Sequence, residues 1–154
     1  MRRVFCLLAA VVAACCISCE KPDRPSKDKD KDKDPSAAFV GEWNFTEQYS
    51  LQWGTDKSDE SGSGSFTVTK VNENRVNVTG FFKSAGLISG EMMNIAAYSV
   101  DDPDMKVTYA FGPAYVKGDV LTFEYSAYGR ATKNGLPWSY DKKSKVTATR
   151  VKAN

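Results

Sequence analysis

One acidic residue interrupts a run of alternating aromatic and aliphatic side chains, and it is the clearest candidate for chemistry in this chain. Between residues 42 and 53 the odd positions are Trp43, Phe45, Glu47, Tyr49, Leu51 and Trp53, and the even positions after Glu42 are all polar. This alternation predicts a long strand with one apolar face. Glu47 is therefore expected to point inward, where a carboxylate needs a partner or its pKa rises.

Two roles are open for Glu47. In the first, it forms an internal pair with an arginine or a tyrosine and stabilises the fold. In the second, it is the polar anchor of a ligand pocket, with Tyr49 and Trp53 towards the open end, because small-molecule pockets combine apolar walls with a few polar groups. A β-bulge would reverse the alternation and move Glu47 into solvent.

The residue types present exclude several kinds of catalytic and metal site. The chain has no histidine, and none of its four cysteines lies beyond Cys19. A Ser–His or Cys–His nucleophile is therefore excluded, as are zinc and copper sites built from imidazole or thiolate. No pair of carboxylates stands out, and no glycine loop has the context of a phosphate-binding motif. We expect a protein that is not an enzyme and has no cofactor and no metal site.

The N-terminal segment predicts where the protein resides. Arg2 and Arg3 precede a short apolar run, and charge resumes at Glu20. This pattern, with a cysteine where the apolar run stops, is typical of a bacterial lipoprotein signal peptide, here residues 1–18. The expected location is the cell envelope, in particular the outer membrane of a Gram-negative bacterium, with an N-terminal lipid as the contact with the membrane.

Two cysteines compete for the lipid. Cys19 lies at the boundary between the apolar run and the charged stretch, whereas Cys15 follows Val12-Ala13-Ala14, which is closer to the consensus sequence for lipidation. We favour Cys19 because the apolar region should end where insertion into hydrocarbon stops being favourable. An ordinary secretory signal that happens to contain cysteines is the other interpretation.

Residues 19–37 predict a tether between the lipid and a folded domain at residues 38–154. The tether alternates lysine with aspartate, contains three prolines and has no large apolar side chain after the signal, so it is expected to be disordered. As a coil it would span roughly 20–25 Å. Arg2 and Arg3 account for the formal net charge of +2. The processed protein is therefore nearly neutral, without a basic patch, and no nucleic-acid partner is expected.

The pattern of the domain is β throughout. Strands are expected at residues 42–53, 66–71, 75–82, 105–111, 120–128 and 145–151, while 87–100 is ambiguous between strand and a helical turn and is interpreted as strand. Residues 54–65 and 129–138 are expected to be loops. Seven to nine short strands without a long helix predict an antiparallel eight-stranded barrel, with a β-sandwich as the alternative. Closure into a barrel would remove exposed sheet edges.

Three residues resemble a motif of the calycin group, which includes the lipocalins. Gly41 and Trp43 match its Gly-x-Trp motif at the start of the first strand, and Arg150 lies where a basic residue of the last strand packs on that tryptophan. The chain is similar to small bacterial lipoproteins with a calycin-like domain. The resemblance implies a barrel that holds a small molecule, although the paired cysteines of many lipocalins and a clear C-terminal helix are absent from the sequence.

Two functions follow as expectations. The first is a lipid-anchored envelope protein that binds a small apolar or amphipathic ligand inside the barrel. The alternative is a protein-interaction module, such as an inhibitor or an assembly subunit, that acts through its loops. Trp138 in the second expected loop is either an anchor for such a partner or a lid on the barrel mouth. Interior volume separates the two functions, because a barrel filled by its own side chains holds no ligand.

Overall fold

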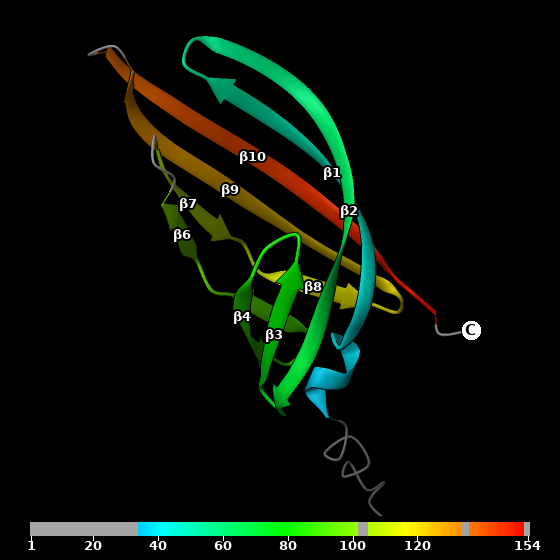
Figure 1. Cartoon of the computed structure of the whole chain (residues 1–154). Coiled ribbons are helices and arrows are strands. Elements are labelled where there is room, and N and C mark those ends of the chain that lie inside the picture. The colour runs from blue at the N-terminus through cyan, green and yellow to red at the C-terminus, as the bar shows by residue number, and fades with distance from the viewer. Residues whose placement is uncertain (1–33, 102–104, 134–135, 153–154) are drawn as a thin grey trace, which may run out of the picture. The chain divides into compact units, whose positions relative to one another are not determined.

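The computed structural model of the chain describes residues 34–101, 105–133 and 136–152, and this part forms one antiparallel sheet of ten strands (Figure 1). The strands are β1 (Gly41–Trp53), β2 (Asp56–Asn72), β3 (Arg75–Gly80), β4 (Ser84–Ser89), β5 (Met92–Ile95), β6 (Tyr98–Asp101), β7 (Lys106–Phe111), β8 (Ala114–Lys117), β9 (Val120–Lys133) and β10 (Leu136–Arg150). The predicted signal peptide, both candidate lipid-bearing cysteines and the tether up to residue 33 lie outside the described residues. In the described part, no helix has the length and apolar character needed to cross a membrane.

Eight strands close into a ring. Hydrogen-bonded neighbours follow the order β10-β1-β2-β3-β4-β5-β8-β9, and β9 pairs again with β10. The edge of β9 opposite β10 is shared, since β8 pairs with it around Leu121 and β7 pairs with it from Tyr125 onward. The ring is not evenly arranged round an axis. The prediction of an all-β antiparallel fold is confirmed, and the ring of eight strands is compatible with a barrel-like fold.

The prediction of a loop at residues 54–65 is wrong, because most of this stretch belongs to β2. Residues 56–65 pair with β1 along their whole length. The glycines that indicated flexibility serve packing instead: a Cβ atom on Gly64 would lie 2.8 Å from the Phe45 ring, and one on Gly62 would lie 3.0 Å from a carboxylate oxygen of Glu47. Glycine in a strand commonly marks such a close approach.

The second expected loop, at residues 129–138, is also wrong. β9 continues to Lys133, and β10 starts at Leu136. Trp138 therefore lies on a strand, paired with Ala131 of β9. The ambiguous stretch 87–100 falls in three short strands: a turn connects β4 to β5, and residues 96–97 connect β5 to β6. The strand β8 was not predicted.

A hydrophobic core fills the closed part of the ring. Its buried members include Trp43 of β1, Phe66 of β2 and Phe123 of β9. The Phe66 and Phe123 rings meet edge to face, with centroids 6.1 Å apart, an arrangement that aromatic pairs favour. The alternation predicted for the first strand is observed, since Trp43, Phe45 and Glu47 are buried while the residues between them are exposed.

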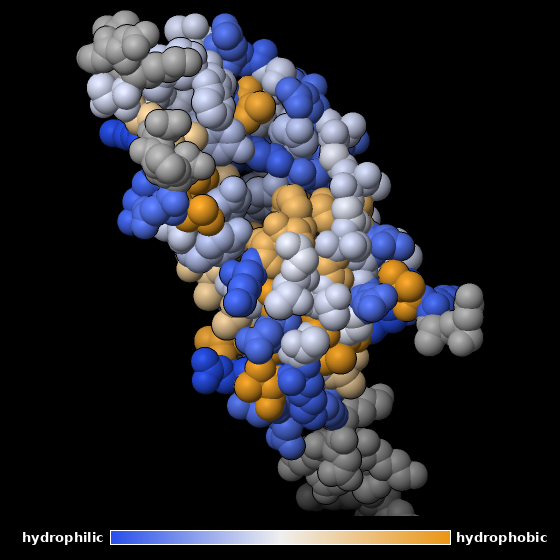
Figure 2. Space-filling view, in the orientation of Figure 1, coloured by the Kyte–Doolittle hydropathy of each residue, from blue (hydrophilic) through white to orange (hydrophobic). Residues whose placement is uncertain are grey.

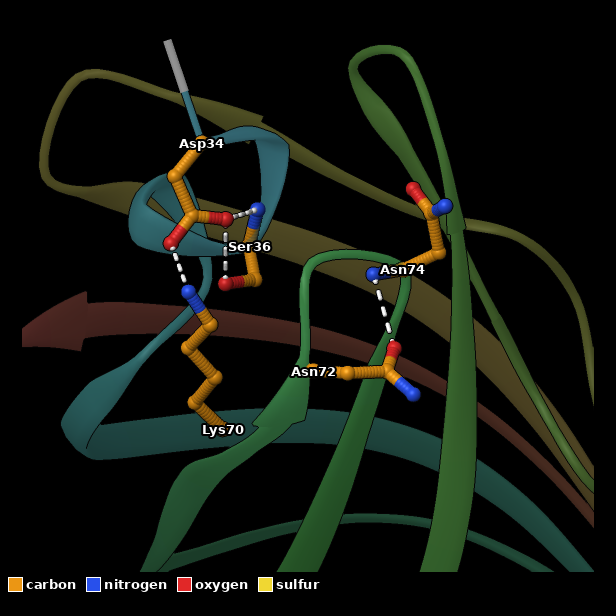
Figure 3. A network of polar contacts seen from close by, with 5 residues as sticks. All are labelled: Asp34, Ser36, Lys70, Asn72 and Asn74. Atoms are coloured by element: carbon orange, nitrogen blue, oxygen red, sulfur yellow. Dashed lines mark hydrogen bonds and ion pairs between the residues drawn. The ribbon is translucent and has the colours of Figure 1, made fainter.

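A capped helical turn begins the described chain (Figure 3). Pro35–Ala38 forms a 3₁₀ helix, η2, and the carboxylate of Asp34 accepts hydrogen bonds from the backbone N–H and the hydroxyl of Ser36, at 3.0 and 2.7 Å. Asp34 also forms an ion pair with Lys70 of β2. Ser36 is fully buried, so the folded part starts a few residues before the boundary expected at residue 38.

The same view includes the turn between β2 and β3. The side chain of Asn72 accepts a hydrogen bond from the backbone N–H of Asn74 at 3.0 Å. An asparagine that bonds to the backbone two residues on is a common way to close a turn. The turn between the strands expected at residues 66–71 and 75–82 is thus stabilised locally, near the ion pair of Lys70 with Asp34.

Candidate functional site

Glu47 points to the inner face of the sheet, where three side chains of β9 and β10 donate hydrogen bonds to it. Its side chain is 5% exposed. Oε2 accepts hydrogen bonds from the hydroxyls of Tyr125 (β9) and Ser144 (β10) at 2.7 and 2.6 Å. Oε1 accepts one from the ammonium group of Lys142 (β10) at 2.8 Å. We call these four residues the Glu47 network. The interpretation of Glu47 as part of an internal pair expected an arginine or a tyrosine as its partner. A tyrosine is among the partners, and the cation is a lysine.

The environment of the network keeps Glu47 ionised. Burial on its own would raise the pKa of the carboxyl, but the hydrogen bonds from Lys142, Ser144 and Tyr125 outweigh this effect and hold the pKa below its usual range. Burial and the bond to Glu47 raise the pKa of the Tyr125 hydroxyl, which stays protonated as a donor. A carboxylate that accepts three bonds in a dry setting is stabilised in its charged form. The network therefore holds the Glu47 carboxylate in an ion pair with Lys142.

Lys142 links the network to the side chains further along β1. Its ammonium group lies 3.7 Å from the centre of the Tyr49 ring, a cation–π contact. The Tyr49 hydroxyl donates a hydrogen bond of 2.8 Å to Glu60 of β2, and this bond raises the pKa of Tyr49. The path from Glu47 through Lys142 and Tyr49 thus ends at a carboxylate on β2.

A small cavity lies next to the network and is lined mainly by aromatic rings. Its volume is about 100 Å³. The lining residues come from β6, β7, β9, β10 and the segment after β3; they are Phe81, Phe82, Tyr98, Tyr109, Phe111, Tyr125, Tyr140 and Lys142. We call this set the aromatic cleft. Figure 2 shows a recess between β2 and the β6–β7 hairpin, with hydrophobic surface along its lower side.

Tyrosines give the cleft its polar groups. The rings of Tyr98 and Tyr109 are stacked, with centroids 4.8 Å apart and planes 9° from parallel. Burial, and then the neighbouring Tyr109, raise the pKa of Tyr98 to about 12. Burial likewise raises the pKa of Tyr140. These hydroxyls therefore remain protonated at neutral pH, so the cleft offers phenol groups and one ammonium group between apolar walls.

Trp53 and Trp138 lie at the rim rather than inside. Trp53, expected to line a pocket, is 44% exposed. Its ring makes edge contacts with Trp138 and Tyr140, at centroid distances of 6.1 and 5.4 Å. Trp138 also covers Gly54, where a Cβ atom would lie 3.5 Å from the indole. The two tryptophans thus pack on each other across the ends of β1 and β10, and Tyr140 connects them to the cleft.

Gly41, Trp43 and Arg150 meet in the closed part of the ring, away from the cleft. The guanidinium carbon of Arg150 lies 4.5 Å from the centre of the fully buried Trp43 ring. The same side chain donates hydrogen bonds to the carbonyls of Val40 and Ala38. Gly41 has a φ of 142°, and a Cβ atom there would lie 3.0 Å from Arg150. Glycine is needed at this position for both reasons.

A larger hollow lies mainly on the other face of the strands. It measures about 870 Å³, and small polar and charged side chains such as Gln48, Ser50, Lys143 and Lys145 form most of its lining. Gln48, Ser50, Lys143 and Lys145 are all exposed. Of the side chains that line the hollow, Tyr49 and Tyr125 are the only aromatic ones and none is aliphatic. Small-molecule sites are lined mainly by hydrophobic and aromatic side chains, so the aromatic cleft is the stronger candidate.

Sequence reasoning identified Glu47 but missed most of its surroundings. Lys142 and Ser144 were not assigned to a strand, because Asp141, Lys142 and Lys143 resemble a solvated loop. The usable signal was alternation: Tyr140, Lys142 and Ser144 continue the inward positions that Val146 and Ala148 occupy at the end of β10. Phe81 fell within the strand expected at residues 75–82, but β3 ends at Gly80 and Phe81 lies just beyond it.

Comparison with known proteins gives no family assignment. No protein-family model matches the chain, and no curated protein matches it.

Proposed function

We propose that the folded unit is a binding module that recognises a protein partner at the aromatic cleft. The observation that carries this proposal is the volume of the cleft, about 100 Å³. Pockets that enclose a small molecule usually measure about 300–1,000 Å³, so this cavity accommodates one side chain rather than a whole ligand. Trp53 and Phe81 are 44% and 41% exposed beside it, and exposed aromatic side chains often anchor protein interfaces.

A small amphipathic ligand is the second candidate. Lys142 places an ammonium group beside aromatic walls, an arrangement that suits a molecule with a polar head and an apolar part. Because the ammonium is already paired with Glu47 at 2.8 Å, a ligand would have to compete with that ion pair. This competition makes the small ligand the weaker of the two candidates.

The proposal includes the location and the family relationship expected from the sequence. The protein would be a lipoprotein held by Cys19, with Cys15 as the alternative, on a Gram-negative outer membrane, without enzymatic activity or a nucleic-acid partner. Support for a calycin-like fold comes from the stacking of Arg150 on Trp43 and from the ring of eight strands. The hairpin of β6 and β7, which extends outside the ring, has no counterpart in an eight-stranded barrel.

Photo-crosslinking in the producing bacterium tests the partner. The full chain would carry p-benzoylphenylalanine at Phe81 in one strain and at Leu87 in a control strain; Leu87 is 56% exposed and lies on β4. We expect one crosslinked protein from position 81 that is absent from position 87. The same products at both positions, or none at position 81, would contradict the proposal. A small-molecule adduct in native mass spectrometry, with no crosslinked protein, would favour the second candidate.

The anchor is tested separately. We expect Cys19→Ser to abolish incorporation of radiolabelled palmitate and to release the protein into the aqueous phase of a detergent partition. Cys15→Ser is the matched control and should leave both properties unchanged. The reverse pattern would assign the lipid to Cys15, and labelling in both variants would contradict lipidation at either single position.

A further inference from the structure

The hydrogen bonds that close the ring do not extend over its whole length, and beside the cleft two sheet edges are left without a partner strand. Residues 56–65 of β2 pair with β1 on one side, whereas β3 pairs only with the later part of β2, from Phe66 onward. At the other end of the sheet order, β6 pairs with β7 alone. Within the described residues, no strand pairs with the second edge of either segment. Figure 1 shows β2 and the β6–β7 hairpin on opposite sides of this opening.

Two chains of contacts connect the edge of β2 to the cleft. In the first, Gly64 leaves room for the Phe45 ring, whose centroid lies 4.7 Å from that of Phe81 in the cleft. In the second, Glu60 accepts a hydrogen bond from Tyr49, whose ring lies under the ammonium group of Lys142. A chain lying along this edge would therefore reach both the apolar wall and the polar end of the cleft.

The edge carries an excess of negative charge. Residues 56–65 contain three acidic residues, Asp56, Asp59 and Glu60, and one basic residue, Lys57. Glu60 is firmly ionised, because hydrogen bonds from Ser58 and Tyr49 lower its pKa. An acidic strand attracts a basic segment and repels a second copy of itself, since like charges across a strand pair are destabilising.

We propose, on the basis of the proposed function above, that a basic and extended segment of the protein partner adds as a strand to residues 56–65 of β2. Main-chain hydrogen bonds to the edge would supply affinity, and one apolar side chain would enter the aromatic cleft to supply specificity. The volume of about 100 Å³ matches one side chain. The chain's own tether is a poor occupant, because residues 20–37 contain no large apolar side chain.

A defined peptide tests this mode of binding on the full-length protein in detergent micelles. The probe is fluorescein-labelled Lys-Val-Thr-Leu-Thr-Val-Lys with a C-terminal amide, measured by fluorescence anisotropy. Two further probes carry N-methyl groups either on the odd-numbered or on the even-numbered residues. In an added strand only alternate N–H groups face the neighbouring strand. We expect one methylated probe to lose at least about 30-fold in affinity and the other to stay within about 3-fold.

The outcomes separate this inference from the proposed function. If the unmethylated probe does not bind at 1 mM, or if both methylated probes bind equally well or equally poorly, the strand-addition mode is wrong. A partner crosslinked at Phe81 would in those cases still support binding at the cleft. If strand addition is shown but no partner is crosslinked in the host, the edge is competent for peptides and the proposed function fails instead.

Two variants test the charge argument. Asp56→Asn combined with Asp59→Asn should weaken binding of the unmethylated probe by about 3- to 10-fold at low salt and should flatten its salt dependence. Glu73→Gln, in the exposed turn after β2, is the control and should leave affinity unchanged. Equal effects from both changes would overturn the assignment of the basic partner to this edge.

Discussion

Glu47 shows how a single charged residue is accommodated inside an aromatic face. Its carboxylate replaces the water it loses with three donors at 2.6–2.8 Å. The side chain of Lys142, its counter-ion, is itself only 13% exposed. A buried ion pair often adds little net stability, but removing one partner leaves the other charged and unpaired in a poor solvent. Replacing Glu47 should therefore reduce the free energy of unfolding by more than the ion pair contributes to it.

The first prediction concerns this asymmetry. Glu47→Gln should lower the free energy of unfolding by about 3 kcal/mol, because the mostly buried ammonium group of Lys142 loses the carboxylate with which it is paired. The measurement is urea-induced unfolding at pH 7, followed by tryptophan fluorescence. Glu42→Gln is the control, since Glu42 is exposed on the same strand and its replacement should change stability by less than about 0.5 kcal/mol. Equal effects of the two changes would mean that the network has no structural role.

The same network predicts a pH dependence. The pKa of Glu47 is lower in the folded protein than its ordinary value of 4.5. Its ionised form therefore stabilises the fold fully above pH 4.5, and this contribution is lost as the pH falls through the lower, folded-state pKa. The difference in unfolding free energy between the wild type and Glu47→Gln should be constant near neutral pH and should shrink in acid. A difference that grows in acid would contradict the assigned direction of the shift.

At the scale of the elements, glycine in β2 decides how closely the side chains of β1 approach that strand. Gly64 lies opposite Phe45 in register, and the Phe45 ring occupies the space where a Cβ atom would be, at 2.8 Å. Gly64→Ala should destabilise the fold by about 1–2 kcal/mol through overpacking, because Phe45 is held by Phe66 and Phe81 and has little room to move. Thermal unfolding measures the effect. Ser63→Ala, at the exposed neighbour, should be nearly neutral, and a neutral Gly64→Ala would show that the ring can move aside.

These elements also explain which parts of the fold could be predicted from sequence. β1 was predicted nearly to the residue because Trp43, Phe45 and Glu47 alternate with polar residues and are buried on one face. The first half of β2 was missed because its residues are small or charged and largely exposed, so no apolar pattern marks it as a strand. Pairing with β1, a tertiary interaction, decides its structure and overrides the weak local preference.

The candidate site was predictable only in part for the same reason. Glu47 can be identified from the sequence because it is one charged residue within an alternating apolar pattern. Its partners Lys142 and Ser144 lie almost a hundred positions away in sequence, and the register that brings them together is set by the whole length of β10 against β1. The cleft depends further on Phe81, in a segment without regular structure. Sequence alternation identifies a face, but it does not identify what that face encloses.

At the scale of the whole molecule, the sheet has a closed part and an open part, which should differ in stability. Val146 and Ala148 of β10 are buried and lie between β9 and β1. β6 pairs only with β7, and its ion pair between Asp101 and Lys106, at 3.5 Å with both side chains exposed, contributes less than about 1 kcal/mol. The stacking of Tyr98 on Tyr109 also holds β6, but a strand with one partner strand should open locally at lower free energy than β10, which has two.

Amide hydrogen exchange tests this difference. Backbone amides around Val146 should exchange only through global unfolding, and the hydrogen-bonded amides of β6 should exchange at least about 100-fold faster. The lower global stability of Glu47→Gln should speed exchange of the amides around Val146 and leave exchange in β6 nearly unchanged. This difference distinguishes global from local opening. Saturation with the unmethylated peptide should then slow exchange in residues 56–65 of β2, because added main-chain bonds hold that edge closed. If β6 were as well protected as β10, the open side of the ring would be as stable as the closed side, and the expectation of local opening in β6 would be wrong.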